Sequence, residues 1–204
     1  TRLCLQALEQ HIHGGEKVLD LGCGSGILSI AALLLGAKDA FACDIDDKCV
    51  GVAYENAALN GVGKEHYTVR AGDVLSDKRL QKEFGGDYDV IVANIVADVI
   101  IALAPQVGKL LKKGGIFLCS GIIDDRAEEV REKLVEAGWQ IEETRSSEGP
   151  SNRRSEKKVQ RRRPPPAAET GRSCWGSGQQ DASDSEADAG SRNPALSAKQ
   201  TERL

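Results

Sequence analysis

Residues 18–26 read VLDLGCGSG, an apolar run that leads directly into a turn with three glycines. The run predicts a buried strand, and the glycines let the chain turn sharply while a ligand lies against bare backbone. A second apolar run, at 40–43, ends in the carboxylate of Asp44. This succession of strand, glycine turn and acid-terminated strand is typical of a doubly wound α/β sheet that holds an adenosine cofactor.

The spacing of the glycines bears on which cofactor is held. Gly22, Gly24 and Gly26 follow the pattern G-x-G-x-G, whereas many dinucleotide folds show G-x-G-x-x-G. Asp20 stands two residues before the first glycine, where a carboxylate would repel a pyrophosphate but attract the ammonium group of a methionine moiety. We therefore expect S-adenosylmethionine rather than a dinucleotide. Asp44 suits either ligand, because a carboxylate there can accept hydrogen bonds from ribose hydroxyls.

Predicted strands and helices alternate over the first 145 residues, which indicates a Rossmann-like, mostly parallel sheet with helices on both faces. A polar loop is expected between residues 71 and 88. The expected helices are 2–12, 24–35, 47–60, 98–112 and 124–137, and the expected strands are 17–21, 39–44, 66–71, 88–94, 116–120 and 139–144.

Two further polar residues follow predicted strands. Asp73 comes after the third strand and Asn94 ends the fourth. The loops after parallel strands share one edge of the sheet, so we expect both residues at the ligand site. Asp73 would accept from an adenine amino group, and Asn94 would orient a reacting amine or the methionine end of the cofactor. Each could instead serve only its own loop, Asp73 as a cap and Asn94 as a turn former.

Composition divides the chain near residue 147. Residues 1–147 carry 16 basic and 23 acidic side chains, a net charge of −7, and hold every Phe, Tyr and Ile, whereas residues 148–204 carry 11 basic and 8 acidic side chains and one aromatic residue. We expect a globular domain at 1–147 and a low-complexity, disordered tail at 148–204. Seven basic residues lie within 153–163 without interleaved aromatic residues, so direct nucleic-acid binding is not expected there. The abrupt change of composition also suggests a reading-frame change in the gene as a further possibility.

Other classes of site find little support. The six cysteines form no C-x-x-C pair and the three histidines lack ligand spacing, so neither a metal site nor a disulfide framework is expected. We expect Cys23, Cys43 and Cys119 to be buried thiols. There is no apolar run of membrane-spanning length, and we expect a cytoplasmic protein. The chain contains no methionine, even at position 1, and we expect it to be a fragment.

These motifs together resemble the catalytic domain of the PrmA family, bacterial class I methyltransferases that modify the large-subunit ribosomal protein numbered eleven. The glycine motif alone indicates only a class I methyltransferase. The resemblance becomes specific through Asn-Ile-Val-Ala at 94–97 and Ser-Gly-Ile at 120–122, with further matches at 1–5, 43–46 and 55–61. It implies methyl transfer from S-adenosylmethionine to lysine ε-amines and an N-terminal α-amine of that ribosomal protein. It also implies cofactor contacts at Thr1, Gly22, Asp44 and Asn94.

The sequence departs from the family pattern in two places. The family has a small domain that grips the ribosomal protein, and we expect this fragment, which begins at Thr1, to lack it; we also expect Gly149–Arg154 to stand in place of the strand that would close the sheet. We therefore expect the closing strand to be missing and substrate recognition to be impaired.

Two alternatives remain open. One is a class I methyltransferase for another protein, a nucleic acid or a small molecule, although residues 94–97 lack the Asn-Pro-Pro-aromatic motif frequent in methylases of nucleic-acid amines. The other is a cofactor-binding fragment without turnover. No residue is singled out as a general base; Asn94 is the candidate for a catalytic role.

Overall fold

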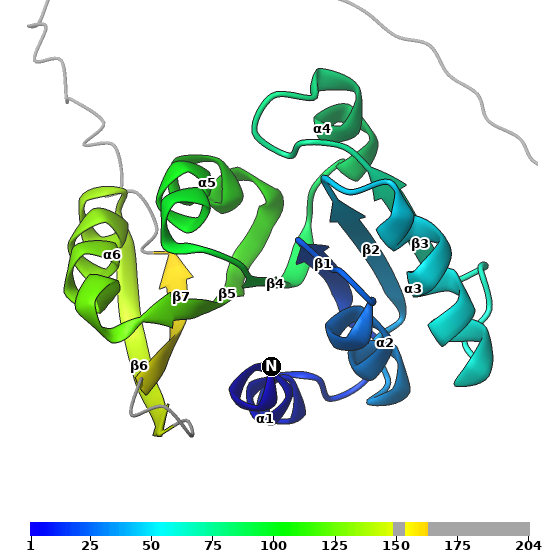
Figure 1. The fold of residues 1–204 in the computed structure, drawn as a ribbon, viewed down its shortest axis with the longest axis horizontal. Helices are drawn as coiled ribbons and strands as arrows, with labels where there is room; N and C mark the ends of the chain where they lie inside the picture. Colours follow the sequence, from blue (N-terminus) through cyan, green and yellow to red (C-terminus); the bar gives the residue numbers. More distant parts are fainter. Residues whose placement is uncertain (149–153, 163–204) are drawn as a thin grey trace, which may run out of the picture. The chain divides into compact units, whose positions relative to one another are not determined.

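A computed structural model describes residues 1–148 and 154–162, which form one seven-stranded sheet between two layers of helices (Figure 1). The strands lie in the order β3-β2-β1-β4-β5-β7-β6. The strands are β1 (Lys17–Leu21), β2 (Asp39–Asp44), β3 (Tyr67–Ala71), β4 (Tyr88–Asn94), β5 (Leu111–Ile123), β6 (Trp139–Glu148) and β7 (Arg154–Arg162). The helices are α1 (Arg2–His11), α2 (Ile27–Leu34), α3 (Lys48–Leu59), α4 (Lys78–Phe84), α5 (Ala97–Leu110) and α6 (Asp124–Glu136).

Strands β1 to β5 pair in parallel, which confirms the predicted mostly parallel, Rossmann-like sheet. The register aligns Leu21 with both Cys43 and Ala93, and Asn94 with Ser120. The carboxyl ends of these strands therefore meet at one edge, as the sequence predicted.

The expectation of a missing closing strand was wrong. Strand β7 pairs antiparallel with β5 on one side and with β6 on the other, so it fills the place that we expected to be empty. Val159 is the only aliphatic residue in this strand, and its sequence gives no sign of a buried strand. Ladder pairing on both sides, rather than apolar patterning, places it in the sheet. The rest of the expected tail, 149–153 and 163–204, lies outside the described residues.

Each face of the sheet has its own core, and alternate residues of a strand belong to different cores. Val18 faces the layer of α1, α2 and α3, whereas Leu19 and Leu21 face the layer of α4, α5 and α6. Because both faces are buried, these strands are nearly continuous apolar runs. Asp20 is the one charged residue in the apolar part of β1. It lies two residues after Val18 and therefore on the same face, toward α1 and α2.

Helix α4 lies in the region that we expected to be a polar loop. Its first turn is capped by Asp77, whose Oδ1 accepts hydrogen bonds from the backbone N–H groups of Arg79 (2.8 Å) and Leu80 (3.1 Å). Its last residue, Phe84, is buried and packs edge-to-face on Phe41 with 5.2 Å between ring centroids. The helix thereby packs on the face of the sheet that carries Phe41.

Candidate cofactor site

The glycine turn after β1 is built by backbone conformations that favour glycine. Gly22, Gly24 and Gly26 have φ angles of +76°, +52° and +79°, so α2 begins at Ile27 rather than at residue 24 as predicted. A Cβ atom at Gly22 would clash with Ile95 Cγ2, and one at Gly26 would lie 2.5 Å from Tyr67 Oη. At Gly24 a Cβ atom would meet no atom within 4 Å. The first and third glycines thus allow close packing, while the second leaves open space above the turn.

Asp44 is locked against this turn. Its Oδ2 accepts the backbone N–H of Gly24 at 2.8 Å, and its Oδ1 accepts that of Asp46 at 3.0 Å. A carboxylate oxygen has two acceptor positions, so both oxygens can accept one further hydrogen bond. The side chain is therefore oriented in advance to receive two neighbouring hydroxyl groups, which is what a ribose presents.

A cleft of about 470 Å³ opens beside Asp44. Its polar lining comes from the loops after β1, β2 and β3, including Gly22, Asp44 and Asp73, and its walls are aliphatic. Two wall residues are unusually exposed for their type, Ile45 at 77% and Val96 at 63%. An aliphatic slot with few polar groups suits a flat ring system. The walls comprise Ile45, Val74, Leu75, Ile95, Val96 and Val99.

Our sequence reasoning missed these walls. The available signal was Ile45, an apolar residue directly after the strand-ending acid, where a solvent-exposed loop residue would ordinarily be polar.

Asp73 borders the cleft and also caps its own loop. Its Oδ2 accepts the Ser76 hydroxyl at 2.6 Å and its Oδ1 accepts the backbone N–H of Leu75 at 2.9 Å. These two hydrogen bonds lower the pKa of the Asp73 carboxyl group. Asp73 therefore caps its own loop, which was one of the two predicted roles. It also lines the cleft together with Asp44.

Asn94 and Thr1 meet although they are far apart in the sequence. The Asn94 side chain donates through Nδ2 to Thr1 Oγ1 at 3.3 Å. Asn94 ends β4, and by strand alternation it follows Val90 and Val92, which face the α1–α2 layer. Because Nδ2 is used for this contact, the amide oxygen is held as an acceptor at the strand end, in register with Ser120.

Asp20 lies beneath the turn and is not part of the cleft lining. The residue is 1% exposed, its Oδ2 accepts the backbone N–H of Ser29 at 3.1 Å, and its Oδ1 has no partner among the described residues. Burial raises the pKa of its carboxyl group to about 6 against the lowering effect of Ser29, and Asp44 raises it further. An unpaired buried oxygen is costly and uncommon. A positive charge nearby would favour the ionised form of this carboxyl group.

The predicted residues therefore fall into two groups, one on each face of the sheet edge. Gly22, Asp44 and Asp73 border the cleft, and Gly24 donates to Asp44. Thr1, Asn94 and Asp20 lie on the α1–α2 side. This division fits an elongated ligand that crosses the carboxyl ends of β1 and β4, with its ring system in the cleft and its charged end on the opposite side.

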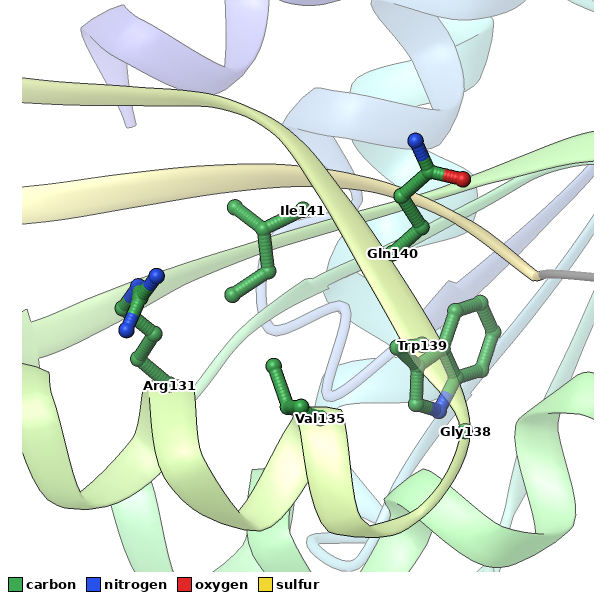
Figure 2. A pocket seen from close by; sticks show the side chains of 6 residues that line it. All are labelled: Arg131, Val135, Gly138, Trp139, Gln140 and Ile141. Atoms are coloured by element: carbon green, nitrogen blue, oxygen red, sulfur yellow. The ribbon is translucent and has the colours of Figure 1, made fainter.

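A second hollow, of about 550 Å³, lies between α6 and β6 (Figure 2). Arg131 at its rim pairs with Glu128 at 3.1 Å, and the indole N–H of Trp139 donates to the Ala104 carbonyl at 2.9 Å. No loop from the carboxyl edge of the parallel strands contributes to its lining. The hollow is therefore separate from the cofactor site.

Within residues 1–148 and 154–162, no group of three or more His, Cys, Asp or Glu side chains could hold a metal ion. None of the helices in this part of the chain combines the length and the hydropathy needed to cross a bilayer. Cys23, Cys43 and Cys119 are buried, as predicted.

Comparison with known proteins agrees with this geometry. The family model described as ribosomal protein L11 methyltransferase (PrmA) matches residues 1–153. A relative of that description from Caldanaerobacter subterraneus subsp. tengcongensis is 50% identical over 136 residues, which are 67% of this chain and 41% of the relative. The crystal structure of a ribosomal protein L11 methylase from Lactobacillus delbrueckii subsp. bulgaricus has a TM-score of 0.69 and 34% identity, covering 79% of this chain and 77% of that one.

The crystal structure of SMU.776, described as a putative methyltransferase complexed with SAH, shares the fold, with a TM-score of 0.65 and 14% identity over 78% of this chain and 48% of that one. The chain spans less than half the length of the curated relatives that it matches. The predicted resemblance is confirmed by the family model and by relatives that are 44–50% identical. By this match and by its fold, the chain belongs to the ribosomal protein L11 methyltransferase (PrmA) family.

Proposed function

We propose that the chain carries the catalytic domain of an S-adenosylmethionine-dependent methyltransferase that acts on lysine ε-amines and the N-terminal α-amine of ribosomal protein L11. The observation that carries this proposal is the Asp44 carboxylate, held by the backbone N–H groups of Gly24 and Asp46 beside an aliphatic cleft. Membership of the family supports the reaction and the substrate.

The residues present fit this cofactor along its whole length. Asp44 would accept the two ribose hydroxyls, and the walls around Ile45 and Val99 would enclose the adenine, with Asp73 beside its amino group. Asp20, with its unpaired buried oxygen, would attract the ammonium group of the methionine moiety. When bound, S-adenosylmethionine supplies a methyl group activated by a positively charged sulfur.

Transfer of that methyl group moves positive charge from sulfur to nitrogen, so little new charge has to be stabilised. The protein's contribution is then mainly the alignment of the acceptor amine. The amine must arrive neutral, whereas a free lysine has a pKa of about 10.4. A substrate that covers the aliphatic rim around Val96 would exclude water there, which would disfavour the charged amine. Asn94, with its amide fixed by Thr1, would accept an N–H of the amine and aim the nitrogen lone pair at the methyl group.

The charge of the domain supports a basic protein as substrate. Residues 1–147 carry a net charge of −7, which attracts a lysine-bearing partner during encounter. We propose a cytoplasmic reaction, because the proposed substrate is a ribosomal protein. Direct nucleic-acid binding forms no part of the proposal.

The cofactor proposal is tested by calorimetric titration of the full chain with S-adenosylmethionine and, separately, with NAD. We expect saturable binding of S-adenosylmethionine alone, weakened at least tenfold by Asp44→Ala, because a hydrogen bond to a charged group contributes about 1.5–3 kcal/mol. Asp47→Ala is the matched control, since Asp47 lies on the same loop and its side chain makes no cap hydrogen bond. Binding of NAD, or no effect of Asp44→Ala, would contradict the assignment.

The substrate is tested by incubating the chain with isolated ribosomal protein L11 and labelled S-adenosylmethionine. We expect label on lysine and N-terminal amines, reduced in Asn94→Ala. Cofactor binding without any methylation of the ribosomal protein would favour the alternative of a binding fragment and would overturn the substrate proposal.

A further inference from the structure

A buried chain of hydrogen bonds runs beneath the glycine turn and joins three elements. The Ser29 hydroxyl, on α2, donates to the Gly26 carbonyl at 3.0 Å and lies 2.9 Å from Tyr67 Oη, on β3. With the serine proton used on Gly26, the tyrosine is the donor in the second contact. The backbone N–H of Ser29 then donates to Asp20 Oδ2, on β1. Tyr67, Ser29 and Asp20 are each at most 1% exposed.

This arrangement fixes one oxygen of Asp20 and leaves the other without a partner. The groups that act on the carboxyl group are Ser29 from α2 and Asp44 from β2, and no cationic side chain of the described residues is among them. Asp20 in turn acts on its neighbours: after burial, it is the main cause that raises the pKa of the Cys23 thiol. Asp20 is therefore a buried acid in an environment that lacks a counter-charge.

We propose that Tyr67 and Ser29 are positioning residues that hold the Asp20 carboxyl group beneath the turn, and that binding of a cationic cofactor displaces the proton that Asp20 carries in the free chain. The inference rests on the proposed function, since it takes the ligand to be S-adenosylmethionine. The proton balance is simple. The O–H bond of Asp20 breaks, the proton leaves to solvent, and the positive charge of the bound cofactor balances the charge of the buried carboxylate.

The consequence is a cofactor affinity that depends on pH. Burial gives the Asp20 carboxyl group a pKa of about 6, so in the free chain it is about half protonated at pH 6. If only the carboxylate form binds, the affinity is proportional to the ionised fraction and is about tenfold weaker at pH 5 than at pH 7. Loss of the Tyr67 hydroxyl would loosen Ser29, whose hydrogen bond favours the carboxylate, and so would move this transition to higher pH.

The first measurement is calorimetric titration of the full chain with S-adenosylmethionine at pH 6 in two buffers that differ in ionisation enthalpy. We expect about half a proton to be released per cofactor bound by the unmodified chain, and none by Asp20→Asn. Binding without proton release, or equal release from both chains, would overturn the inference while leaving the proposed function intact. Absence of saturable binding would overturn both.

The positioning role is tested by the affinity from pH 5 to pH 8 for Tyr67→Phe and for Tyr88→Phe. Tyr88 is the matched control, because it is also a buried tyrosine. Its hydroxyl donates to the carbonyl of Phe84 at 2.8 Å, away from Asp20. We expect Tyr67→Phe to shift the midpoint of the affinity profile upward and Tyr88→Phe to leave it in place. Ser29→Ala, which keeps the backbone N–H, gives a second test in which we expect the same upward shift. Equal midpoints in all chains would overturn the positioning role.

Discussion

Replacement of Asp20 by asparagine is expected to make the folded chain more stable at neutral pH while weakening its affinity for the cofactor. Asp20 is fully buried, and one of its oxygens has no hydrogen-bond partner among the described residues. Its charge therefore costs free energy in the folded state and none when the chain is unfolded in water. Asparagine has nearly the same shape, keeps an oxygen for the Ser29 N–H and carries no charge.

The magnitude and its pH dependence follow from the pKa of the Asp20 carboxyl group, raised from 3.8 to about 6 by burial. Between these values the folded state holds a proton that the unfolded state has lost, so stability falls as the pH rises through this window. A pKa difference of about two units corresponds to about 3 kcal/mol at pH 7, and integration leaves only about 0.5 kcal/mol at pH 4. The gain from Asp20→Asn should follow this curve.

The assay is urea unfolding of both chains at pH 7 and at pH 4. Asp87→Asn serves as control, since Asp87 is exposed and its positive φ of 60° is one that asparagine tolerates. We expect a gain of about 2–3 kcal/mol for Asp20→Asn at pH 7 that nearly vanishes at pH 4, and no comparable gain for the control. A loss of stability at pH 7, or a gain of equal size at both pH values, would refute the reasoning.

Three further outcomes are expected. Gly22→Ala should lower cofactor affinity and lower the free energy of urea unfolding by about 1–3 kcal/mol, because the added methyl group meets Ile95. Adding Ile95→Ala to this variant should restore part of the lost stability. Gly24→Ala should lower the free energy of unfolding by only about 1 kcal/mol, because alanine is strained at its positive φ. Gly121→Ala should lower it more, since its Cβ atom would lie 2.7 Å from the Ile95 carbonyl oxygen. Equal unfolding midpoints for the two variants would contradict this. Truncation after Glu148 removes β7 and should cause association visible by light scattering, because β5 and β6 lose their shared partner.

The sequence predicted those parts of the fold whose signals are local. The glycine turn, β2 and β4 could be predicted because apolar runs end abruptly in glycine or in a polar residue, and the bounds of these two strands agree with the structure. Helix α4 was missed because it is short, and its cap by Asp77 looks like ordinary loop polarity. Strand β7 was missed because an arginine- and lysine-rich segment contains no apolar alternation, and pairing with β5 and β6 is a tertiary effect.

The candidate site was predictable to a similar degree. The strand-end positions of Asp44, Asp73 and Asn94 followed from topology, since loops after parallel strands share an edge. The contact between Asn94 and Thr1 joins residues 93 positions apart, and that between Ser29 and Tyr67 joins residues 38 apart. Neither contact has a sequence pattern, because each depends on how helices pack on the sheet.

The position of β7 between β5 and β6 also has a consequence for biosynthesis. The ribosome makes β6 before the one strand with which it pairs, and at roughly 5–20 residues per second the interval from Trp139 to Arg162 lasts on the order of 1–5 s. During that interval the nascent chain presents one open edge on β5 and an unpaired β6. A chain whose translation pauses in this segment is thus the form most exposed to edge-to-edge aggregation, and the sheet becomes complete only when the last described strand has been synthesised.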